Sequence, residues 1–366
     1  MNEQEKYDWM VYVSCMTYNH APYIVDAMNG FTMQETNFPF VCAVVDDAST
    51  DGEQEVIKSY LNEHFDLEDK NVARHEETND YVLTFARHKT NKNCYFAVLY
   101  LKYNHYSIKK SKIPYIAQWR ENAKYIALCE GDDYWIAPDK LQKQVVYLEN
   151  HPDYTMACNR TQLYSVKQNK MIGENYCYDK SCDMIPKDVI YRTGLFISTC
   201  SIVYRKEVTD NRSEYWVQCK VGDYPLQIGC AMKGKVFYFN DIMSVYRIEN
   251  SNSWMGQQKW GKMDKRRLEI IKSRVDMLDG FSKDYPLCED FFKRKIANEI
   301  NRNISDSFSK QEIKQYRAFF SKEIENYSFF QKLDLLIRQL GIPKITGLYI
   351  RLFQSQYNQR KLVYKE

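Results

Sequence analysis

Short apolar runs alternate with segments of helical spacing through the first half of the chain. Three runs are typical of buried strands: 10–16, 40–45 and 124–129. Three segments carry apolar residues at helical spacing: 23–34, 53–63 and 139–150. Because the strands show no polar alternation and helices join them, we expect an α/β fold with a mainly parallel central sheet that helices cover on both faces.

The pattern changes along the rest of the chain. Residues 153–248 mix strands, one of them expected at 195–204, with a helix near 224–232. From residue 255 onward the sequence is a series of long, charged helical stretches with few strand signals. We therefore expect two parts, an α/β part at 1–254 and a mostly helical C-terminal region at 255–366.

Composition excludes several classes of protein. The 366 residues are 44% hydrophobic and 27% charged, which is too apolar for a disordered chain. The 51 Lys+Arg nearly balance the 48 Asp+Glu, and this balance does not fit a protein whose main partner is nucleic acid. The balance hides two oppositely charged parts, because residues 255–366 hold 23 Lys+Arg and 14 Asp+Glu (+9), whereas residues 1–254 hold 28 and 34 (−6).

Cysteine usage and hydropathy indicate the compartment. The 11 cysteines include no C-x-x-C pair, and several lie within apolar runs, where they are typical of small buried side chains. No apolar segment follows a basic N-terminus, and no uncharged run reaches the roughly 18 residues that a membrane span requires. We expect a reduced, cytoplasmic protein.

Carboxylates gather where two of the expected strands end. Asp46 and Asp47 follow the second strand, and Glu130, Asp132 and Asp133 follow the third. Ligands of parallel sheets bind beyond the carboxyl ends of the strands, so these acids are expected to serve a site. Oxygen ligands without a nearby His or Cys cluster suit Mn²⁺ or Mg²⁺. The alternative for Asp46 and Asp47 is a solvated turn that caps the next helix.

Four motifs in order carry a resemblance to a known family. They are Thr17-Tyr-Asn-His20, Val44-Val-Asp-Asp-Ala-Ser-Thr-Asp-Gly52, Ala127-Leu-Cys-Glu-Gly-Asp-Asp-Tyr-Trp135, and Gly222-Asp-Tyr-Pro-Leu226 followed by Val245-Tyr-Arg247. Over roughly the first 250 residues the chain resembles the family-2 glycosyltransferases. The resemblance implies that residues 1–254 form a catalytic domain with the GT-A fold, which has a Rossmann-like sheet.

The resemblance also implies a donor, a nucleotide-diphosphate sugar that in this family is usually a UDP-sugar. Thr17, Tyr18 and Asn19 stand in the first-strand motif and would contact the nucleotide-sugar. Asp47 would accept a hydrogen bond from the base, and Asp132 would hold the ribose or assist the metal.

The remaining acids would perform the chemistry that the resemblance implies. Asp133 would ligate the Mn²⁺ or Mg²⁺ that bridges the diphosphate. Asp223 would be the general base for the acceptor hydroxyl. This base would lie on the face of the sugar opposite the diphosphate, so that the anomeric configuration inverts. From the residues alone, Asp223 is also a typical helix N-cap, and the two roles can coexist. After Arg247 the family often has His where this chain has Glu249, which leaves open whether the closing loop contributes a ligand.

A basic loop supplies one more candidate for the donor side. Lys110 ends the segment 104–110, which resembles a loop that precedes the E-G-D-D-Y-W motif in part of the family, and it would meet the diphosphate as a point charge. The alternative is a basic surface loop.

Candidates for the acceptor side have structural alternatives as well. Thr199 and Ser201 match a segment near the acceptor, but hydroxyls there equally suit backbone groups at a strand end. Tyr134, Trp135 and Trp254 are candidates for stacking on sugar faces, with core packing as the alternative.

The sequence therefore predicts a metal-dependent, inverting glycosyltransferase that acts on a glycan or lipid-linked glycan in surface-polysaccharide biosynthesis. A nucleotidyltransferase would need a glycine-rich, basic loop after the first strand, where this chain has Thr17-Tyr-Asn-His-Ala-Pro22. A non-catalytic module that binds a glycan or a nucleotide-sugar is the other alternative, and the intact acids disfavour it.

The C-terminal region lies outside the resemblance. Apolar residues recur at helical spacing over 329–340, and a further apolar run covers 345–353. A basic amphipathic helix can lie on the inner face of an anionic membrane, which would suit a lipid-linked acceptor. The alternative is that these helices pack on the catalytic domain or on a second subunit.

Overall fold

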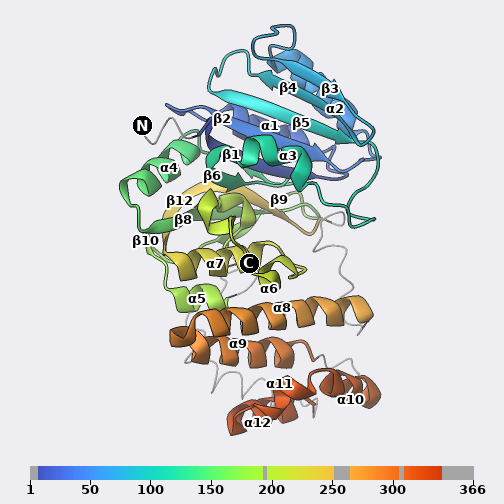
Figure 1. The fold of residues 1–366 in the computed structure, drawn as a ribbon, viewed down its shortest axis with the longest axis vertical. Coiled ribbons are helices and arrows are strands. Elements are labelled where there is room, and N and C mark those ends of the chain that lie inside the picture. Colours follow the sequence, from blue (N-terminus) through green and yellow to red (C-terminus); the bar gives the residue numbers. More distant parts are fainter. Residues whose placement is uncertain (1–6, 193–195, 251–263, 305–308, 340–366) are drawn as a thin grey trace.

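The computed structural model describes residues 7–192, 196–250, 264–304 and 309–339. A β-sheet with helices on both faces forms one end of the molecule, and the C-terminal helices are stacked in layers beyond it (Figure 1). The expected α/β class, with a mainly parallel central sheet and a helical C-terminal region, is confirmed.

Parallel strands form the centre of the sheet in the order β6–β1–β2–β5. Their bounds are β1 Trp9–Thr17, β2 Phe40–Asp46, β5 Cys94–Leu101 and β6 Ala123–Leu128. Successive residues of a strand point to opposite faces, so that in β1 Val11 and Val13 join the core on one face and Tyr12 joins the core on the other. Burial of both faces explains why these strands are apolar throughout.

Antiparallel pairings extend the sheet on both sides. β4 and β3 follow β5, and β11, β8, β12 and β10 follow β6, with β8 and β12 parallel to each other. The bounds are β3 Arg74–Glu77, β4 Tyr81–Arg87, β7 Tyr134–Trp135, β8 Tyr154–Ser165, β9 Lys170–Asn175, β10 Cys182–Asp183, β11 Val203–Arg205 and β12 Lys235–Ile248. The short β7 pairs with β12 and so attaches the acidic turn after β6 to the far half of the sheet.

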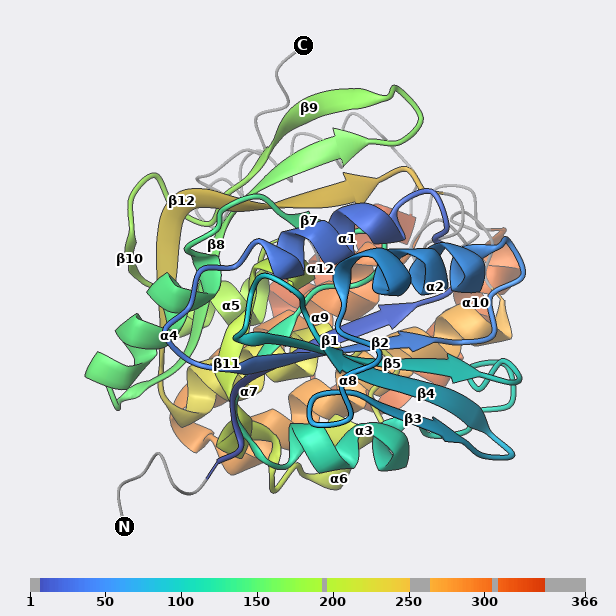
Figure 2. The same ribbon diagram turned by 90° about the horizontal axis from the view of Figure 1, so that it is seen from above.

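Helices cover both faces of the central strands (Figure 2). Those on one face are α1 Ile24–Thr32, α2 Glu53–His64 and α4 Lys140–Asn150. Those on the other are α3 Ile113–Arg120, α5 Pro186–Tyr191, α6 Glu214–Val217 and α7 Asp223–Lys233. The helices expected from spacing match α1, α2, α4 and α7 closely, because each presents an apolar stripe to the sheet.

The strand expected at 195–204 is wrong over most of its described length. Thr199–Ser201 forms a 3-10 turn, η2, and only Val203–Arg205 joins the sheet as β11. The Ser201 backbone N–H and hydroxyl both donate to the Ser198 carbonyl oxygen (3.0 and 2.7 Å). This local bonding takes the place of a strand ladder.

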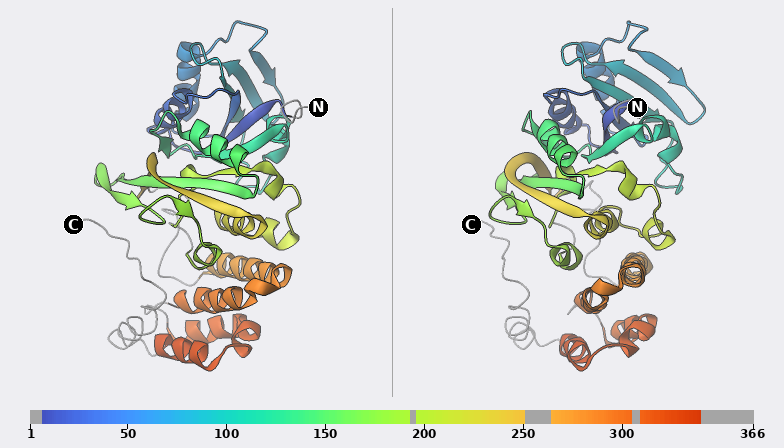
Figure 3. Two further views of the ribbon diagram at one scale, coloured as in Figure 1. Left: turned by 90° about the vertical axis from the view of Figure 1, so that its left-hand side faces the viewer. Right: turned by 60° about the vertical axis from the view of Figure 1, so that its left-hand side comes forward.

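The described part of the C-terminal region forms five helices, of which the first two contact the α/β part. They are α8 Lys265–Asp284, α9 Glu289–Arg302, α10 Lys310–Phe319, α11 Ser321–Glu325 and α12 Phe329–Gln339. α8 contacts α6, and α9 contacts α5 (Figure 3). A Cβ on Gly280 of α8 would lie 2.2 Å from Cγ of Tyr215 in α6, so this helix packs with no space for a side chain there.

One hydrophobic core continues from the sheet into these helices. It includes Tyr12 of β1, Tyr224 of α7, Phe281 of α8 and Phe292 of α9. No helix in the described part of the chain is long and apolar enough to cross a bilayer. The boundary expected between residues 254 and 255 and the apolar run at 345–353 lie outside the described residues.

Candidate active site

The carboxyl ends of β1, β2 and β6 meet at one edge of the sheet because these strands are parallel neighbours. Thr17 at the end of β1 pairs in register with Asp46 at the end of β2, and the turn Glu130–Asp133 follows β6. Gly131 N–H in this turn donates to the Met16 carbonyl oxygen of β1 (3.1 Å). A Cβ on Gly131 would lie 2.2 Å from Thr17 Oγ1, so the turn can approach β1 only with glycine at this position. The structure thus brings the two acidic turns together.

Arg247, near the end of β12, closes the acidic turn from the opposite side. Its backbone N–H donates to Asp133 Oδ1 (2.8 Å), and its Nη1 donates to the Asp132 carbonyl oxygen (2.7 Å). Its Nη2 pairs with Asp26 of α1, and its guanidinium carbon lies 4.5 Å from the centre of the Tyr134 ring. The buried guanidinium therefore ties α1, β12 and the turn after β6 into one unit.

Asp133 has the most unusual environment of these acids. The residue is 1% exposed, and its Oδ2 is buried with no hydrogen-bond partner in the described structure. Burial raises the pKa of the Asp133 carboxyl well above its usual range, and the charge of Asp132 adds to the rise. Asp132 Oδ2 accepts a hydrogen bond from Asn250 Nδ2 (3.2 Å) and lies 3.8 Å from His20 Nε2. A buried oxygen without a donor costs free energy, so Asp133 is poised for a cation or a ligand.

The acid pair fits a divalent cation that shares its coordination with a substrate. No group of three or more His, Cys, Asp or Glu residues in the described ranges could hold a metal by itself. Asp133 Oδ2 and the Asp132 carboxylate offer oxygen ligands, which Mg²⁺ and Mn²⁺ prefer. Mg²⁺ commonly takes only one or two carboxylates and completes its coordination with substrate phosphates and water.

Glu130 adds a third carboxyl group to the turn. The residue is exposed and lies next to the buried Asp132 and Asp133. Loss of water around it, followed by the charges of Asp132 and Asp223, raises the pKa of Glu130 to about 8. Glu130 therefore shares an electrostatic environment with the first residue of α7.

Asp223 is the first residue of α7, one position beyond the helix cap at Gly222. The N-cap of α7 is thus Gly222, and the alternative that Asp223 itself is the N-cap is wrong by one position. Asp223 Oδ1 accepts a hydrogen bond from the Tyr224 backbone N–H (2.8 Å), and the helix dipole favours a carboxylate at this end. Burial raises the pKa of the Asp223 carboxyl above its usual range, while the Tyr224 N–H and the positive charge of Arg274 oppose the rise. A half-buried carboxylate held in this way is fixed in position and can accept a proton.

The loop after β5 binds both oxygens of Asp47. The backbone N–H groups of His105 and Tyr106 donate to Oδ1 (2.8 Å) and Oδ2 (3.1 Å), and Lys112 Nζ lies 2.8 Å from Oδ2. A carboxylate has about four acceptor positions, so one position remains for a ligand. The sequence did not single out Lys112, and its only signal there is the basic run at 109–112.

Lys110, the lysine expected at the diphosphate, has other partners. Its Nζ pairs with Asp80 (2.9 Å) and lies 2.5 Å from Tyr103 Oη. Tyr115 Oη also donates to Asp80 (2.8 Å), so Lys110 belongs to a cluster that fixes the loop after β5. In this structure it is Lys112, two residues further on, that reaches one of the predicted acids.

Glu53, which the sequence did not single out, organises the loop after β1. The residue is 0% exposed at the start of α2. Its carboxylate accepts hydrogen bonds from Thr17 Oγ1, from the His20 backbone N–H (2.9 Å) and from Ser49 Oγ (2.8 Å). Thr17, expected to contact the nucleotide-sugar, therefore also anchors the loop. A single glutamate at the start of a helical segment gives no sequence signal for such burial.

Asn19 and Tyr18 lie on the same loop. Asn19 has a φ of 57°, in the left-handed region that asparagine tolerates better than most residues. Its N–H donates to Ser49 Oγ (2.8 Å), and its Oδ1 accepts from the Thr50 N–H (2.8 Å). Tyr18 is half-buried beside it. The loops after β1 and β2 are thus locked together at the edge where the acids lie.

Two residues expected on the acceptor side are buried. Trp135 is 1% exposed and its Nε1 donates to the Cys200 carbonyl oxygen (2.8 Å), while Ser201 is 0% exposed and bonds to a carbonyl of its own turn. These positions match the structural alternatives for both residues: Trp135 packs in the core, and Ser201 satisfies the backbone. Thr199 is half-buried next to them. Trp254 lies outside the described residues.

The closing loop after β12 contributes Asn250 to the acids. Glu249 has a φ of 60°, is exposed, and its carboxylate accepts a hydrogen bond from Ser165 Oγ of β8. Asn250 is 3% exposed and reaches Asp132. The turn at Glu249 therefore directs the next side chain toward the site.

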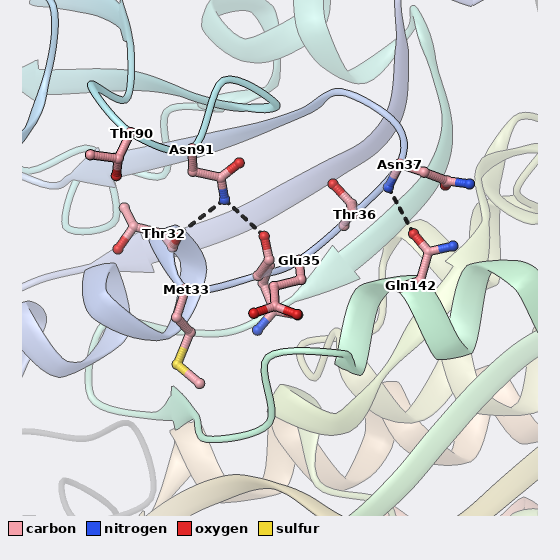
Figure 4. A pocket seen from close by; sticks show the side chains of 9 residues that line it. Thr32, Met33, Glu35, Thr36, Asn37, Thr90, Asn91 and Gln142 are labelled. Carbon is pink, nitrogen blue, oxygen red and sulfur yellow. Dashed lines mark hydrogen bonds between the residues drawn. The ribbon is translucent and has the colours of Figure 1, made fainter.

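A hollow of about 550 Å³ lies at the opposite edge of the sheet, where β2 and β5 begin (Figure 4). Asn91 Nδ2 donates across it to the carbonyl oxygens of Thr32 (2.9 Å) and Gln34 (2.8 Å), and the Asn37 N–H donates to Gln142 Oε1 (2.9 Å). None of the acids described above lines this hollow, so the candidate site is the acidic edge.

No family model matches this chain. Uncharacterised proteins from Mycobacterium bovis and Mycobacterium tuberculosis are 25% identical over 341 residues, which cover 90% of this chain and 83% of each relative.

Similarity to solved structures shows the fold. The crystal structure of S. aureus TarS 1–349 in complex with UDP-GlcNAc superposes with a TM-score of 0.58 at 13% identity, covering 96% of this chain and 94% of that one. The crystal structure of S. aureus TarS superposes with a TM-score of 0.54 at 14% identity, covering 98% of this chain and 59% of that one. The GT-A fold class implied by the four motifs is confirmed.

Proposed function

We propose that this protein is an inverting, metal-dependent glycosyltransferase of the family-2 type. It would move a sugar from a UDP-sugar to a hydroxyl of a glycan in surface-polysaccharide biosynthesis. The observation that carries the proposal is the buried, partnerless Asp133 Oδ2 beside Asp132, at the sheet edge that also carries Asp47. The fold shared with TarS, whose crystal structure holds UDP-GlcNAc, supports a nucleotide-sugar as the donor.

The surroundings of Asp47 support uracil as the base. Uracil presents an N–H between two carbonyl oxygens, so it needs one acceptor flanked by donors. Asp47 keeps one acceptor position, and Lys112 Nζ lies 2.8 Å from its Oδ2 as a donor. The loop of Thr17, Tyr18 and Asn19 adjoins this position and would contact the nucleotide.

The diphosphate would lie against the turn after β6. Asp133, with Asp132, would hold Mn²⁺ or Mg²⁺, and Asp132 also remains the candidate for the ribose. A bound ion would act as a Lewis acid that offsets the charge developing on the leaving diphosphate. Lys110, on the loop after β5, is the candidate for an additional point charge near the phosphates.

Asp223 would accept the proton of the acceptor hydroxyl as that oxygen attacks the anomeric carbon. Its raised pKa brings the carboxyl closer to neutral pH, where a base is more effective. Attack from the side opposite the diphosphate inverts the anomeric configuration. Thr199, half-buried in η2, is the remaining acceptor-side candidate with a hydroxyl near the surface.

We further propose that the protein works in the cytoplasm on a glycan or lipid-linked glycan at the inner face of the membrane. Phe329 and Phe330 of α12 are 74% and 62% exposed, and residues 255–366 carry a net charge of +9, which complements an anionic lipid surface. Phe329→Ser with Phe330→Ser should lower cosedimentation with phosphatidylglycerol vesicles. Equal cosedimentation of the double variant and the wild type would contradict this contact.

Binding of UDP tests the donor assignment. Titration calorimetry with UDP should show tight binding only when Mn²⁺ or Mg²⁺ is present, and Asp133→Ala should weaken that binding at least about tenfold because one charge-assisted ligand is lost. Asp139→Ala, at an exposed aspartate just beyond the motif, is the matched control and should bind as the wild type does. Metal-dependent UDP binding that survives Asp133→Ala would contradict the assignment.

A further inference from the structure

A cluster of three buried or half-buried charges joins the two long C-terminal helices. Arg274 of α8 and Lys295 of α9 both pair with Glu299 of α9, Lys295 at 3.4 Å. Lys295 is 0% exposed and Glu299 is 4% exposed. The positive charges of Arg274 and Lys295 keep the pKa of Glu299 below its usual range despite burial, which favours its ionised form, whereas burial lowers the pKa of Lys295.

The cluster extends directly to the start of α7. Lys295 Nζ donates to the Tyr191 carbonyl oxygen at the end of α5 (3.1 Å) and lies 5.9 Å from the centre of the Tyr224 ring. Tyr224 is 2% exposed, and its hydroxyl donates to the Ile190 carbonyl oxygen. Tyr224 follows Asp223 in the chain, and its N–H holds the Asp223 carboxylate. The contacts therefore run without a break from α8 to the carboxylate of Asp223.

Stability alone gives a weak reason for such a cluster. Replacing buried ion pairs by apolar side chains of similar size is often neutral or stabilising, because charges lose their hydration in the interior. Besides Glu299, the neighbours of Lys295 are a backbone carbonyl and the aromatic ring of Tyr224, and an apolar side chain could pack on that ring as well. The distinctive property of the cluster is its position, because Lys295 lies against Tyr224 in the first turn of α7.

We propose that Arg274, Lys295 and Glu299 are positioning residues for the catalytic base, which makes the C-terminal helices part of the active site. The inference rests on the proposed function of Asp223. Glu299 holds the two cations, Lys295 holds Tyr224 and the end of α5, and Tyr224 holds Asp223. Arg274 also places a positive charge close enough to Asp223 to favour its ionised form.

Several groups face Asp223 and contribute to its charge state. They come from the turn after β6 (Glu130), from the loop before α7 (Cys219) and from α8 (Arg274). Arg274 is the cation among them, so its removal should make the Asp223 carboxyl harder to ionise. The Cys219 thiol is neutral near pH 7, because burial raises its pKa.

The experiment compares variants of the full chain in the hydrolysis of a UDP-sugar with Mn²⁺, in which water takes the place of the acceptor hydroxyl and UDP is released, as a function of pH. Arg274→Met and Lys295→Met should each lower kcat about tenfold or more with an unchanged KM for the donor, because small displacements of a base are costly. Arg274→Met should move the acidic limb of kcat to higher pH, and Arg274→Lys should return it toward the wild-type position. Lys293→Met, at an exposed lysine on α9 like Lys295, is the matched control and should keep the wild-type kcat.

Thermal unfolding of each variant checks that it is folded. Glu299→Gln keeps the size of the side chain and replaces the methionine variants if they do not fold, with the same expected loss of kcat. Folded variants with wild-type kcat and pH profile would overturn the inference. Asp223→Asn separates this result from the proposed function. An active Asp223→Asn enzyme would refute Asp223 as the general base. An inactive Asp223→Asn enzyme, together with cluster variants that keep the wild-type kcat and pH profile, would refute only the positioning role.

Discussion

Arg247 should carry a large share of the local stability of the acidic turn. In Arg247→Met the backbone N–H that donates to Asp133 remains, whereas the guanidinium contacts are lost. The hydrogen bond to the Asp132 carbonyl oxygen is charge-assisted and buried, worth about 1.5–3 kcal/mol. The stacking on Tyr134 adds about 0.5–2 kcal/mol, and the pair with Asp26, which is half exposed, adds at most about 1 kcal/mol. The free energy of unfolding should therefore fall by about 3–5 kcal/mol.

Urea unfolding followed by tryptophan fluorescence measures this loss. Lys70→Met, at an exposed lysine in the loop before β3, is the control and should change the free energy of unfolding by less than about 0.5 kcal/mol. Arg247→Met should also weaken binding of UDP with Mn²⁺ at least about tenfold, because the turn that carries Asp132 and Asp133 is no longer fixed. A loss of stability below about 1 kcal/mol, with UDP binding unchanged, would refute the reasoning that Arg247 closes the site.

Three further predictions concern the chemistry. Asp223→Asn should lower kcat by about 10²–10⁴-fold with little change in UDP affinity, which steady-state kinetics and calorimetry measure. A kcat within tenfold of the wild type would argue against a general base. In the wild type, kcat should fall as the pH drops through the raised pKa of Asp223. The acidic limb of the pH profile of kcat should therefore lie above the ordinary pKa range of an aspartate carboxyl, and a limb near pH 4 would contradict the effect of burial. Lys112→Met should weaken UDP binding about tenfold and reduce the preference for UDP over GDP, whereas equal effects on both nucleotides would remove Lys112 from base recognition.

The central part of the fold could be predicted from the sequence because its signals are local. The apolar runs became β1, β2 and β6 and the helical spacings became α1, α2 and α4, since each pattern reflects a face that must be buried. The meeting of the two acidic turns follows from the parallel arrangement, in which strand ends of one kind share an edge.

The parts that could not be predicted depend on contacts between distant segments. Glu53 is buried because the loop after β1 folds over it, and nothing in its own neighbourhood signals this. Lys112 rather than Lys110 reaches Asp47 because the exact course of the loop after β5 decides which lysine points inward. Trp135 follows the acids directly in sequence, yet the pairing of β7 with β12 turns its ring into the core.

The most direct test of the central claim is the hydrolysis of a panel of UDP-sugars by the full chain, with water in place of the acceptor hydroxyl, with Mn²⁺ and with EDTA, beside Asp223→Asn. We expect metal-dependent release of UDP from at least one UDP-sugar by the wild type. In Asp223→Asn the release should be lost although calorimetry still shows UDP binding. Failure of the wild type to bind or turn over any UDP-sugar in the presence of Mn²⁺ would contradict the assignment of this chain as a glycosyltransferase that uses UDP-sugars.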